Sequence, residues 1–372
     1  MDYEIKIFSS IDNELKKDWL SLEIESYNYC FQCYDWFENW VNSYRIDNSK
    51  ISFSIVVVKY NSKVVGIFPF EIENKFGLKI LKWAGDKQMD YCSPILSKNF
   101  NLDKEKFIDL FNKVIDTIKN IDIIYLIKQP EYIYNLKNPF VQFLKNYIDS
   151  KTYYITLPKK WHEYTKKILK KDFHVQNLRK KKQLKKLGNL KFKIIKDIKE
   201  KNRILDEFII QKNIRLSSKG TADVLESRDL DFYKKFEEKI SKNYKSHLSC
   251  LILNNNLISI HWGIIYKKRF YYLLLSMKEG EFRRYSPGRL LISLLIRWTI
   301  TKKLETFDFT LGDEDYKKSW SNNNSYIYNY IKGVTLNGYY LFLLIKFKLF
   351  LKSIDKKNYL RKIWLKVKKI YK

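Results

Sequence analysis

The chain has 372 residues, a length that suggests two domains of roughly 150–200 residues each. Its apolar fraction of 45% and aromatic fraction of 16% supply packed cores and exclude a wholly disordered chain. The first residues lack the basic segment and apolar core of a signal peptide, and no apolar run approaches the ~20 residues of a membrane span. We therefore expect a cytoplasmic protein.

The net charge of +30 is concentrated in the second part of the chain. Residues 1–150 contain 19 Lys and Arg against 21 Asp and Glu, whereas residues 151–372 contain 52 against 20. If all proteins of the source organism were simply rich in lysine, the first half would be basic as well, and it is not. The imbalance therefore predicts an anionic partner for the second half, which could be cofactor phosphates, a sugar nucleotide, a membrane surface or RNA.

The four cysteines, Cys30, Cys33, Cys92 and Cys250, are too few for a disulfide framework in a chain of this size. Cys30 and Cys33 have the spacing of a zinc or redox pair, but no second pair lies nearby. Buried, reduced, structural cysteines are therefore expected. The four histidines are scattered without the spacing of a metal site, so we expect no metal.

The first half predicts a mixture of helices and strands, from the spacing of its apolar residues. In chain order these are helices at Ile11–Ser26 and Tyr34–Tyr44, strands at Ile51–Lys59 and Val64–Ile72, a helix at Phe107–Lys119 and a strand at Ile121–Ile127. Between the halves, Trp161–Leu187 predicts one long basic helix. This helix is either an electropositive wall facing an anionic ligand or a solvated bridge.

The second half repeats the order of the first. It predicts a strand at Leu190–Ile195, helices at Arg203–Leu216 and Leu230–Ile240, strands at Leu248–Leu253, Leu257–Tyr266 and Phe270–Ser276, a helix at Leu290–Thr301 and a strand at Thr306–Leu311. The shared order suggests two duplicated α/β units.

The segment Arg283–Leu291, with the sequence RRYSPGRLL, joins a predicted strand to a predicted helix. Pro287 fits the first helical turn, and Gly288 lets another group approach the backbone closely. A helix N-terminus with free amides and flanking arginines favours a pyrophosphate. The alternative is a set of arginines that only caps a surface turn. The candidate binding residues are Arg283, Arg284, Ser286, Gly288 and Arg289.

Four motifs occur in an order that resembles a known family. They are LPKKWHEY (Leu157–Tyr164), NLRKKKQLKKLG (Asn177–Gly188), YSPGRLL (Tyr285–Leu291), and FDFTLGD with YKKSW (Phe307–Trp320). Together they resemble the two-domain GNAT-superfamily acetyltransferases related to FemAB and to the cellulose-biosynthesis protein CelD. The order Arg283-x-x-Ser286-x-Gly288 resembles their acyl-CoA pyrophosphate loop, with serine in place of the first glycine.

The resemblance implies an α/β (α+β) protein of tandem GNAT-like domains, each a central mixed sheet flanked by helices. The expected parts are an N-terminal GNAT-like domain (1–156), a basic bridging helix (157–188), a C-terminal GNAT domain with the acyl-donor site (189–338) and a basic amphipathic helical tail (339–372). The donor implied is acetyl-CoA or another acyl-CoA. Relatives nearer to FemAB use aminoacyl-tRNA.

Acyl transfer from a thioester needs a deprotonated amine, a stabilised oxyanion and a protonated leaving thiolate. His261 lies in a strand that would meet the thioester, where it is either the general base or a core histidine. Tyr316 could protonate the thiolate, and Lys317 could hold an oxyanion or an acceptor phosphate. Asp313 is either catalytic or the N-cap of a helix over Asp315–Trp320.

Three further residues are candidates for binding the acceptor. Arg215 lines the acceptor cleft or is simply a cation at a helix C-terminus. Asp90 and Tyr91 bind acceptor hydroxyls or only form a turn.

The tail from Tyr339 to the end of the chain alternates apolar and basic residues. One face of a predicted helix would carry Leu349, Leu360, Ile363, Trp364, Val367 and Ile370. Such a helix fits an anionic membrane surface, or packs on the protein itself.

These features lead to an acyl-CoA-dependent N-acyltransferase as the main hypothesis. The expected acceptor is an amine, on a nucleotide- or lipid-linked sugar of surface polysaccharide biosynthesis, with peripheral attachment to the inner face of the membrane as an option. One alternative is a FemAB-like transferase that uses aminoacyl-tRNA on a cell-wall or polysaccharide precursor. The other is a non-catalytic nucleic-acid or membrane adaptor.

Overall fold

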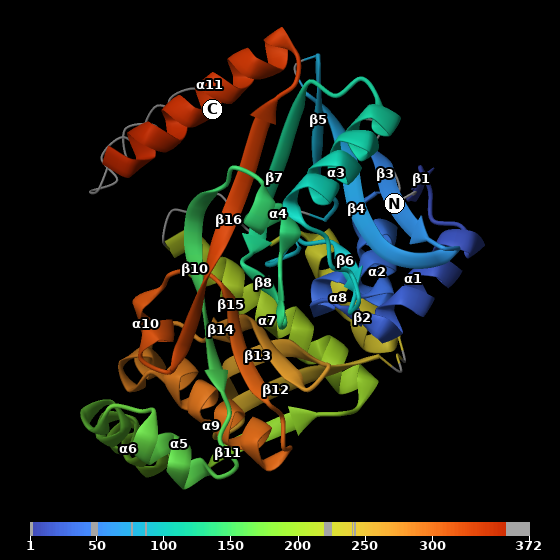
Figure 1. Cartoon of the computed structure of the whole chain (residues 1–372). Helices are drawn as coiled ribbons and strands as arrows, with labels where there is room; N and C mark the ends of the chain where they lie inside the picture. The colour runs from blue at the N-terminus through green and yellow to red at the C-terminus, as the bar shows by residue number, and fades with distance from the viewer. Residues whose placement is uncertain are drawn as a thin grey trace.

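The structure is a computed structural model that describes residues 3–45, 51–75, 77–85, 88–218, 225–239, 241 and 243–354. One 14-stranded mixed sheet runs through both halves of the chain, and helices cover its faces (Figure 1). A two-stranded hairpin, β8 with β9, lies outside that sheet.

The first half contains the elements up to β10. These are β1 (Glu4–Phe8), α1 (Asn13–Glu25), β2 (Ser26–Tyr27), the 3-10 turn η1 (Cys30–Gln32), α2 (Tyr34–Tyr44), β3 (Ile51–Tyr60), β4 (Lys63–Lys75), β5 (Leu78–Trp83), β6 (Ile95–Ser97), α3 (Lys104–Ile118), β7 (Ile123–Pro130), β8 (Tyr132–Ile133), β9 (Leu136–Lys137), α4 (Pro139–Phe143) and β10 (Tyr147–Thr156).

The second half contains the elements from α5 onward. These are α5 (Trp161–Lys167), α6 (Lys171–Lys186), β11 (Leu190–Ile195), α7 (Ile198–Ser218), α8 (Ser227–Glu238), β12 (Tyr244–Leu253), β13 (Asn256–Tyr266), β14 (Arg269–Met277), the 3-10 turn η2 (Glu281–Tyr285), α9 (Pro287–Thr301), β15 (Thr306–Leu311), α10 (Asp315–Lys318), β16 (Asn323–Gly333) and α11 (Leu336–Ile354).

The two halves share one architecture, which confirms the predicted duplication. Each begins with a strand and two helices, continues with three consecutive strands, and ends with a helix and a further strand. The strands are ordered β1-β3-β4-β5-β7 in the first half and β11-β12-β13-β14-β15 in the second. In each half the last pair is parallel and short, with β5 on β7 and β14 on β15.

The halves exchange their final strands. β16 pairs antiparallel with β7 of the first half, and β10 pairs antiparallel with β15 of the second. The two exchanged strands also pair with each other at the centre of the sheet. The sheet is therefore continuous from β1 to β11.

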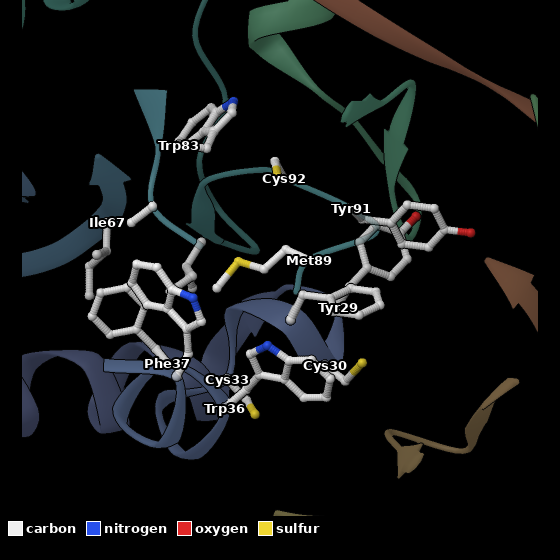
Figure 2. Packing of buried hydrophobic residues seen from close by; sticks show 14 of the residues in the cluster. Tyr29, Cys30, Cys33, Trp36, Phe37, Ile67, Trp83, Met89, Tyr91 and Cys92 are labelled. Carbon is white, nitrogen blue, oxygen red and sulfur yellow. The ribbon is translucent and has the colours of Figure 1, made fainter. Parts of the chain in front are cut away.

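A hydrophobic core crosses between the halves. Trp36 of α2 packs against Phe232 and Phe236 of α8 and against Trp262 of β13. Figure 2 shows the part of this core around Trp36, including three of the cysteines. All four cysteines are buried and free, as predicted. Burial raises the pKa of the Cys30 and Cys33 thiols well above the ordinary value, so both stay protonated.

The basic helix predicted between the halves is instead two helices, α5 and α6. The chain bends between them because Leu169 turns into the protein and is buried. Tyr164, in the middle of α5, is also buried, and its hydroxyl donates to the Trp320 carbonyl oxygen at 2.8 Å. The apolar residues in the middle of the segment are therefore anchors for two helices and not one continuous stripe.

A buried ion pair lies where β14 and β15 meet. The Arg269 guanidinium donates to Asp308 at 2.6 Å, and the Asp308 carboxylate is fully buried. Asp308 also accepts hydrogen bonds from the Tyr91 hydroxyl and from the Thr310 amide, both at 2.8 Å. Because Tyr91 belongs to the first half, this pair links the two halves.

Replacing Arg269 by Met should lower the free energy of unfolding by about 3–5 kcal/mol, because the Asp308 carboxylate would stay buried without its counter-ion. Urea denaturation measures this loss. The control is Lys106→Met, which removes an ion pair whose side chains are about half exposed and should leave stability nearly unchanged. Equal losses for the two variants would contradict a structural role of the Arg269–Asp308 pair.

Candidate functional site

The strands β14 and β15 separate soon after they meet. They pair only over Arg269–Tyr271 and Thr306–Asp308. Beyond this point a cavity of about 580 Å³ lies between the end of β14, helices α7 and α9, and the segment around α10. Four of its lining side chains are basic, namely Lys212, Arg215, Arg283 and Arg289. An anionic ligand is the charge that this lining favours.

The N-terminus of α9 opens into the cavity. Ser286 precedes the helix in the left-handed conformation, with φ 53° and ψ 57°, and its side chain does not cap the helix. Pro287 occupies the first turn. The positive end of the helix dipole therefore lies at the cavity and favours a negatively charged ligand there. The first amides of the helix have partners in the protein, because the Arg289 and Leu290 amides donate to the Ser286 carbonyl oxygen.

Gly288 lies where α9 crosses β14. Its amide is 3.2 Å from the Met277 sulfur, a weak acceptor. A Cβ atom at this position would be 2.5 Å from the same sulfur. Met277 is thus the group that approaches the Gly288 backbone. Because glycine has no side chain, α9 can pack close to β14 at this position.

Two nitrogen atoms of the Arg289 guanidinium lack a hydrogen-bond acceptor among the described residues. These atoms, Nε and Nη2, are buried. The guanidinium lies 4.3 Å from the Phe173 ring centroid, and desolvation lowers its pKa. Arg283, by contrast, is paired with Glu279 at 3.1 Å. Arg289 is therefore the arginine that an incoming anion would satisfy best.

The equivalent helix of the first half does not offer such a site. The Asp103 carboxylate caps α3 by accepting the Lys106 amide at 2.9 Å, and Glu105 lies in the first turn. Negative charge at a helix N-terminus disfavours an anionic ligand. The duplication has thus left an open helix N-terminus in the second half and a closed one in the first.

Tyr316 and Glu314 line the side of the cavity that follows β15. Burial and the nearby Glu314 raise the pKa of Tyr316, so its hydroxyl stays protonated. Glu314 is the carboxylate among the described lining residues, and it forms an ion pair with Lys317 at 2.9 Å. A proton donor and a proton acceptor therefore lie on the same wall.

Tyr272 of β14 is a further candidate that the sequence did not reveal. It is 3% exposed, and its hydroxyl has no hydrogen-bond partner in the residues described here. Burial raises its pKa, with a further increase from Tyr316 and a decrease from Arg215. Both groups are therefore within electrostatic range of the hydroxyl. Several neighbouring strand residues are also aromatic, so no local signal distinguishes Tyr272.

His261 does not lie in the cavity lining. It is completely buried in β13, where its ring stacks on Tyr272 with centroids 4.5 Å apart. Desolvation and the neighbouring His247 lower its pKa well below the ordinary value. The core alternative fits this position, and the general-base role predicted for His261 does not.

Asp313 is also absent from the cavity lining. Its carboxylate accepts a hydrogen bond from the Tyr153 hydroxyl at 2.5 Å, and this bond lowers its pKa. The N-cap of α10 is Glu314, so the predicted capping role of Asp313 is wrong. The helix is also shorter than predicted and ends at Lys318.

Of the four residues predicted to bind the acceptor, one lines the cavity and three do not. Arg215 lines the cavity. Lys317 is 3% exposed and donates to the Leu311 carbonyl oxygen at 2.6 Å, so it holds the segment after β15 in place. Tyr91 is also buried, and its hydroxyl donates a hydrogen bond to the Asp308 carboxylate. Asp90 is partly exposed, and burial raises its pKa against the opposing effects of Thr310, Lys128 and Lys317.

Arg284 borders a second hollow, separate from the cavity. This basic groove has a volume of about 530 Å³ and is lined by Arg179 and Lys180 of α6 together with Arg284 and Tyr285. Lys180 donates to the Arg284 carbonyl oxygen at 2.6 Å. One side of α6 therefore faces a groove, as the electropositive-wall interpretation requires. No cluster of three or more His, Cys, Asp or Glu side chains that could hold a metal occurs in the described ranges.

The strands β14 and β15 thus separate beside a helix N-terminus that no side chain caps. Residues 173–318 match the family model of the acetyltransferase (GNAT) domain. The structure is similar to that of FemX, with a TM-score of 0.58 and 13% identity over 93% of this chain and 100% of that chain. Residues 173–318 therefore match a GNAT domain, and the whole chain has the two-domain, FemAB-like GNAT fold.

Two other solved structures share this fold. One is a conserved protein of unknown function from Bacteroides thetaiotaomicron, with a TM-score of 0.53 and 11% identity over 88% of this chain and 99% of that chain. The other is L-PGS from Bacillus licheniformis, with a TM-score of 0.52 and 8% identity over 91% and 96%. The search of curated proteins found no match.

Replacing Ser286 by Val should lower the free energy of unfolding by about 1–2 kcal/mol, because a β-branched side chain fits the left-handed conformation poorly. Ser286→Gly should stay within about 1 kcal/mol of the original protein, since glycine adopts that conformation without strain. Chemical denaturation measures both. Ser325→Val, in the extended strand β16, is the control and should not destabilise. A fully stable Ser286→Val variant would argue against the left-handed turn.

Proposed function

We propose that the protein is an N-acyltransferase that takes its acyl group from an acyl-CoA, with acetyl-CoA as the simplest donor. The observation that carries this proposal is the unpartnered Arg289 guanidinium beside the uncapped N-terminus of α9. These two features are complementary to a pyrophosphate. Arg283 adds a third positive group at the same end of the cavity.

The remainder of the donor would extend between the separating strands. Beyond Tyr271, β14 no longer pairs with β15, so the edge that faces β15 is open to an extended ligand. An extended chain can add to such an edge through backbone hydrogen bonds. This position brings the thioester toward Tyr272 and Tyr316.

In the proposed reaction, the amine nitrogen attacks the thioester carbonyl carbon, a C–N bond forms and the C–S bond breaks. Glu314 accepts the proton lost by the amine, and the Tyr316 hydroxyl protonates the leaving thiolate. The acceptor is an amine on a nucleotide- or lipid-linked sugar, and Lys212 and Arg215 supply positive charge for its phosphate.

Calorimetric titration with acetyl-CoA and with free CoA tests the donor. Arg289→Met should weaken binding by about 10–100-fold, because charge-assisted hydrogen bonds to the pyrophosphate are lost. Arg297→Met is the matched control, since Arg297 is an exposed arginine on the same helix. No binding of either ligand to the unmodified protein would refute an acyl-CoA donor.

Tyr316→Phe should reduce turnover by about 10²–10⁴-fold while acetyl-CoA affinity stays unchanged, because only the proton for the thiolate is removed. Release of the free CoA thiol in the presence of a panel of amino sugars measures turnover. Tyr326→Phe, in β16, is the control. If Tyr316→Phe retained full turnover, the thiolate would have to receive its proton from another group.

The basic groove beside α6 favours a second candidate, an aminoacyl-tRNA-dependent transferase. Arg179, Lys180 and Arg284 lie along this groove, which lies next to the Arg283 end of the cavity. A polynucleotide would bind there through its phosphates. Transfer that requires charged tRNA and is lost in the double variant Arg179→Met/Lys180→Met would favour this candidate over acyl-CoA.

A further inference from the structure

The helix α11 is fixed to the sheet through its first turn. The Val334 amide donates to the Asp122 carbonyl oxygen at 2.8 Å, and the Thr335 hydroxyl donates to the Asp122 carboxylate at 2.7 Å. A Cβ atom at Gly338 would overlap with the Asp122 backbone carbonyl. Glycine at 338 therefore lets the helix cross the chain just before β7, and the start of α11 has a defined position.

The helix α11 has two apolar faces, and the described part of the chain covers one of them. Leu341, Phe342, Ile345 and Leu349 are partly buried on the side of Gly338. On the opposite side lies an outer stripe of five large side chains that are 46–90% exposed: Leu336, Tyr340, Leu343, Leu344 and Phe347. Their three- and four-residue spacing places them on one face. Figure 1 shows α11 apart from the other helices.

Positive charge lies on both flanks of the outer stripe. The helical periodicity places Lys346 on one flank and Lys348 on the other. The sequence of α11 contains no Asp or Glu. Residues 355–372, which lie outside the described residues, add eight Lys and Arg against one Asp. The tail residues Leu360, Ile363, Trp364, Val367 and Ile370 also lie there, whereas Leu349 belongs to the covered face of α11.

This combination fits the surface of an anionic bilayer better than a second copy of the chain. Apolar side chains enter the boundary between headgroups and acyl chains, while flanking lysines extend to the lipid phosphates. A two-fold pair built on the stripe would instead bring lysines of both copies together without carboxylates from α11. In the described ranges, no helix is long and apolar enough to cross a membrane.

We propose that the outer stripe of α11 docks the protein on an anionic lipid bilayer. Leu343 and Phe347 lie at the centre of the face that enters the bilayer, and Lys348 contacts the headgroups. Lys346, whose ammonium lies 3.9 Å from the Tyr147 ring centroid, adds positive charge at the edge next to the protein. This inference does not depend on the proposed acyl transfer, because α11 contributes no residue to the cavity lining.

Vesicle flotation of the full chain tests the proposal. The protein should float with vesicles of phosphatidylcholine mixed with phosphatidylglycerol, and much less with phosphatidylcholine alone. The double variant Leu343→Ser/Phe347→Ser should bind the anionic vesicles at least about tenfold more weakly. The matched control is Ile24→Ser/Ile210→Ser, which removes two other exposed apolar side chains, 76% and 55% exposed.

A second measurement leaves the stripe largely intact. Because the four native cysteines are buried, Phe347→Cys can be labelled selectively with an environment-sensitive fluorophore. Its emission should shift to the blue when anionic vesicles are added, whereas a label on Ile210→Cys should not respond. Circular dichroism establishes that each variant folds.

Three results would overturn the proposal. They are a lack of flotation with anionic vesicles, equal flotation of the stripe variant and the original chain, and no response of the label at position 347. Sedimentation distinguishes the main rival. A dimer that the stripe variant converts to a monomer, without vesicle binding by either, would assign the stripe to a second copy of this chain.

Discussion

The exchange of β10 and β16 is the constraint on which the rest of the structure depends. Because β10 pairs with β15 and β16 pairs with β7, neither half completes its sheet with its own strands. The exchange also brings the first half against the end of the β14–β15 pair, where Tyr91 and Arg269 hold Asp308. The place where the two strands separate, and with it the cavity, is thus fixed by contacts from both halves.

The two halves share one order of strands and helices but differ at the end of the third consecutive strand and at the start of the helix that follows it. In the first half, Trp83 at the end of β5 packs against Phe140 of α4, and Asp103 closes the N-terminus of α3. In the second half, the matching strand ends on Leu275 and Met277, which line a cavity, and the matching helix begins without a cap. The first half thus ends this region with a packed aromatic pair, whereas the second half has a helix end without a side-chain cap beside the Arg289 guanidinium. This asymmetry is the reason that the proposed ligand site lies in the second half.

The sequence predicted elements whose pattern is local and missed those that depend on distant partners. The bounds of α2, β11 and β15 agree with the predictions because each segment carries its own apolar periodicity. The strand β10 was missed because Asp149, Ser150 and Lys151 interrupt that pattern, and two distant strands supply its pairing instead.

The same distinction applies to the candidate site. The loop around Gly288 was predicted to be an anion site from its residue types alone, and this role stays a prediction. The structure places Ser286, Gly288 and Arg289 in the lining of one cavity. The role of His261 was wrong because burial of its strand face depends on the packing of α9 above it. The sequence did not predict Tyr272 as a candidate, because the separation of β14 from β15 is a property of the whole sheet.

The distribution of positive charge distinguishes the two proposed donors. A pyrophosphate needs only the N-terminus of α9 and the nearby arginines, whereas a polynucleotide also occupies the groove beside α6. The two ligands therefore differ in how many phosphates they bring to the protein. Polynucleotide affinity falls steeply with salt, roughly in proportion to the phosphates neutralised. The affinity for a donor held mainly by Arg289 would depend only weakly on salt concentration, because such a donor contacts few charged groups and these are partly buried.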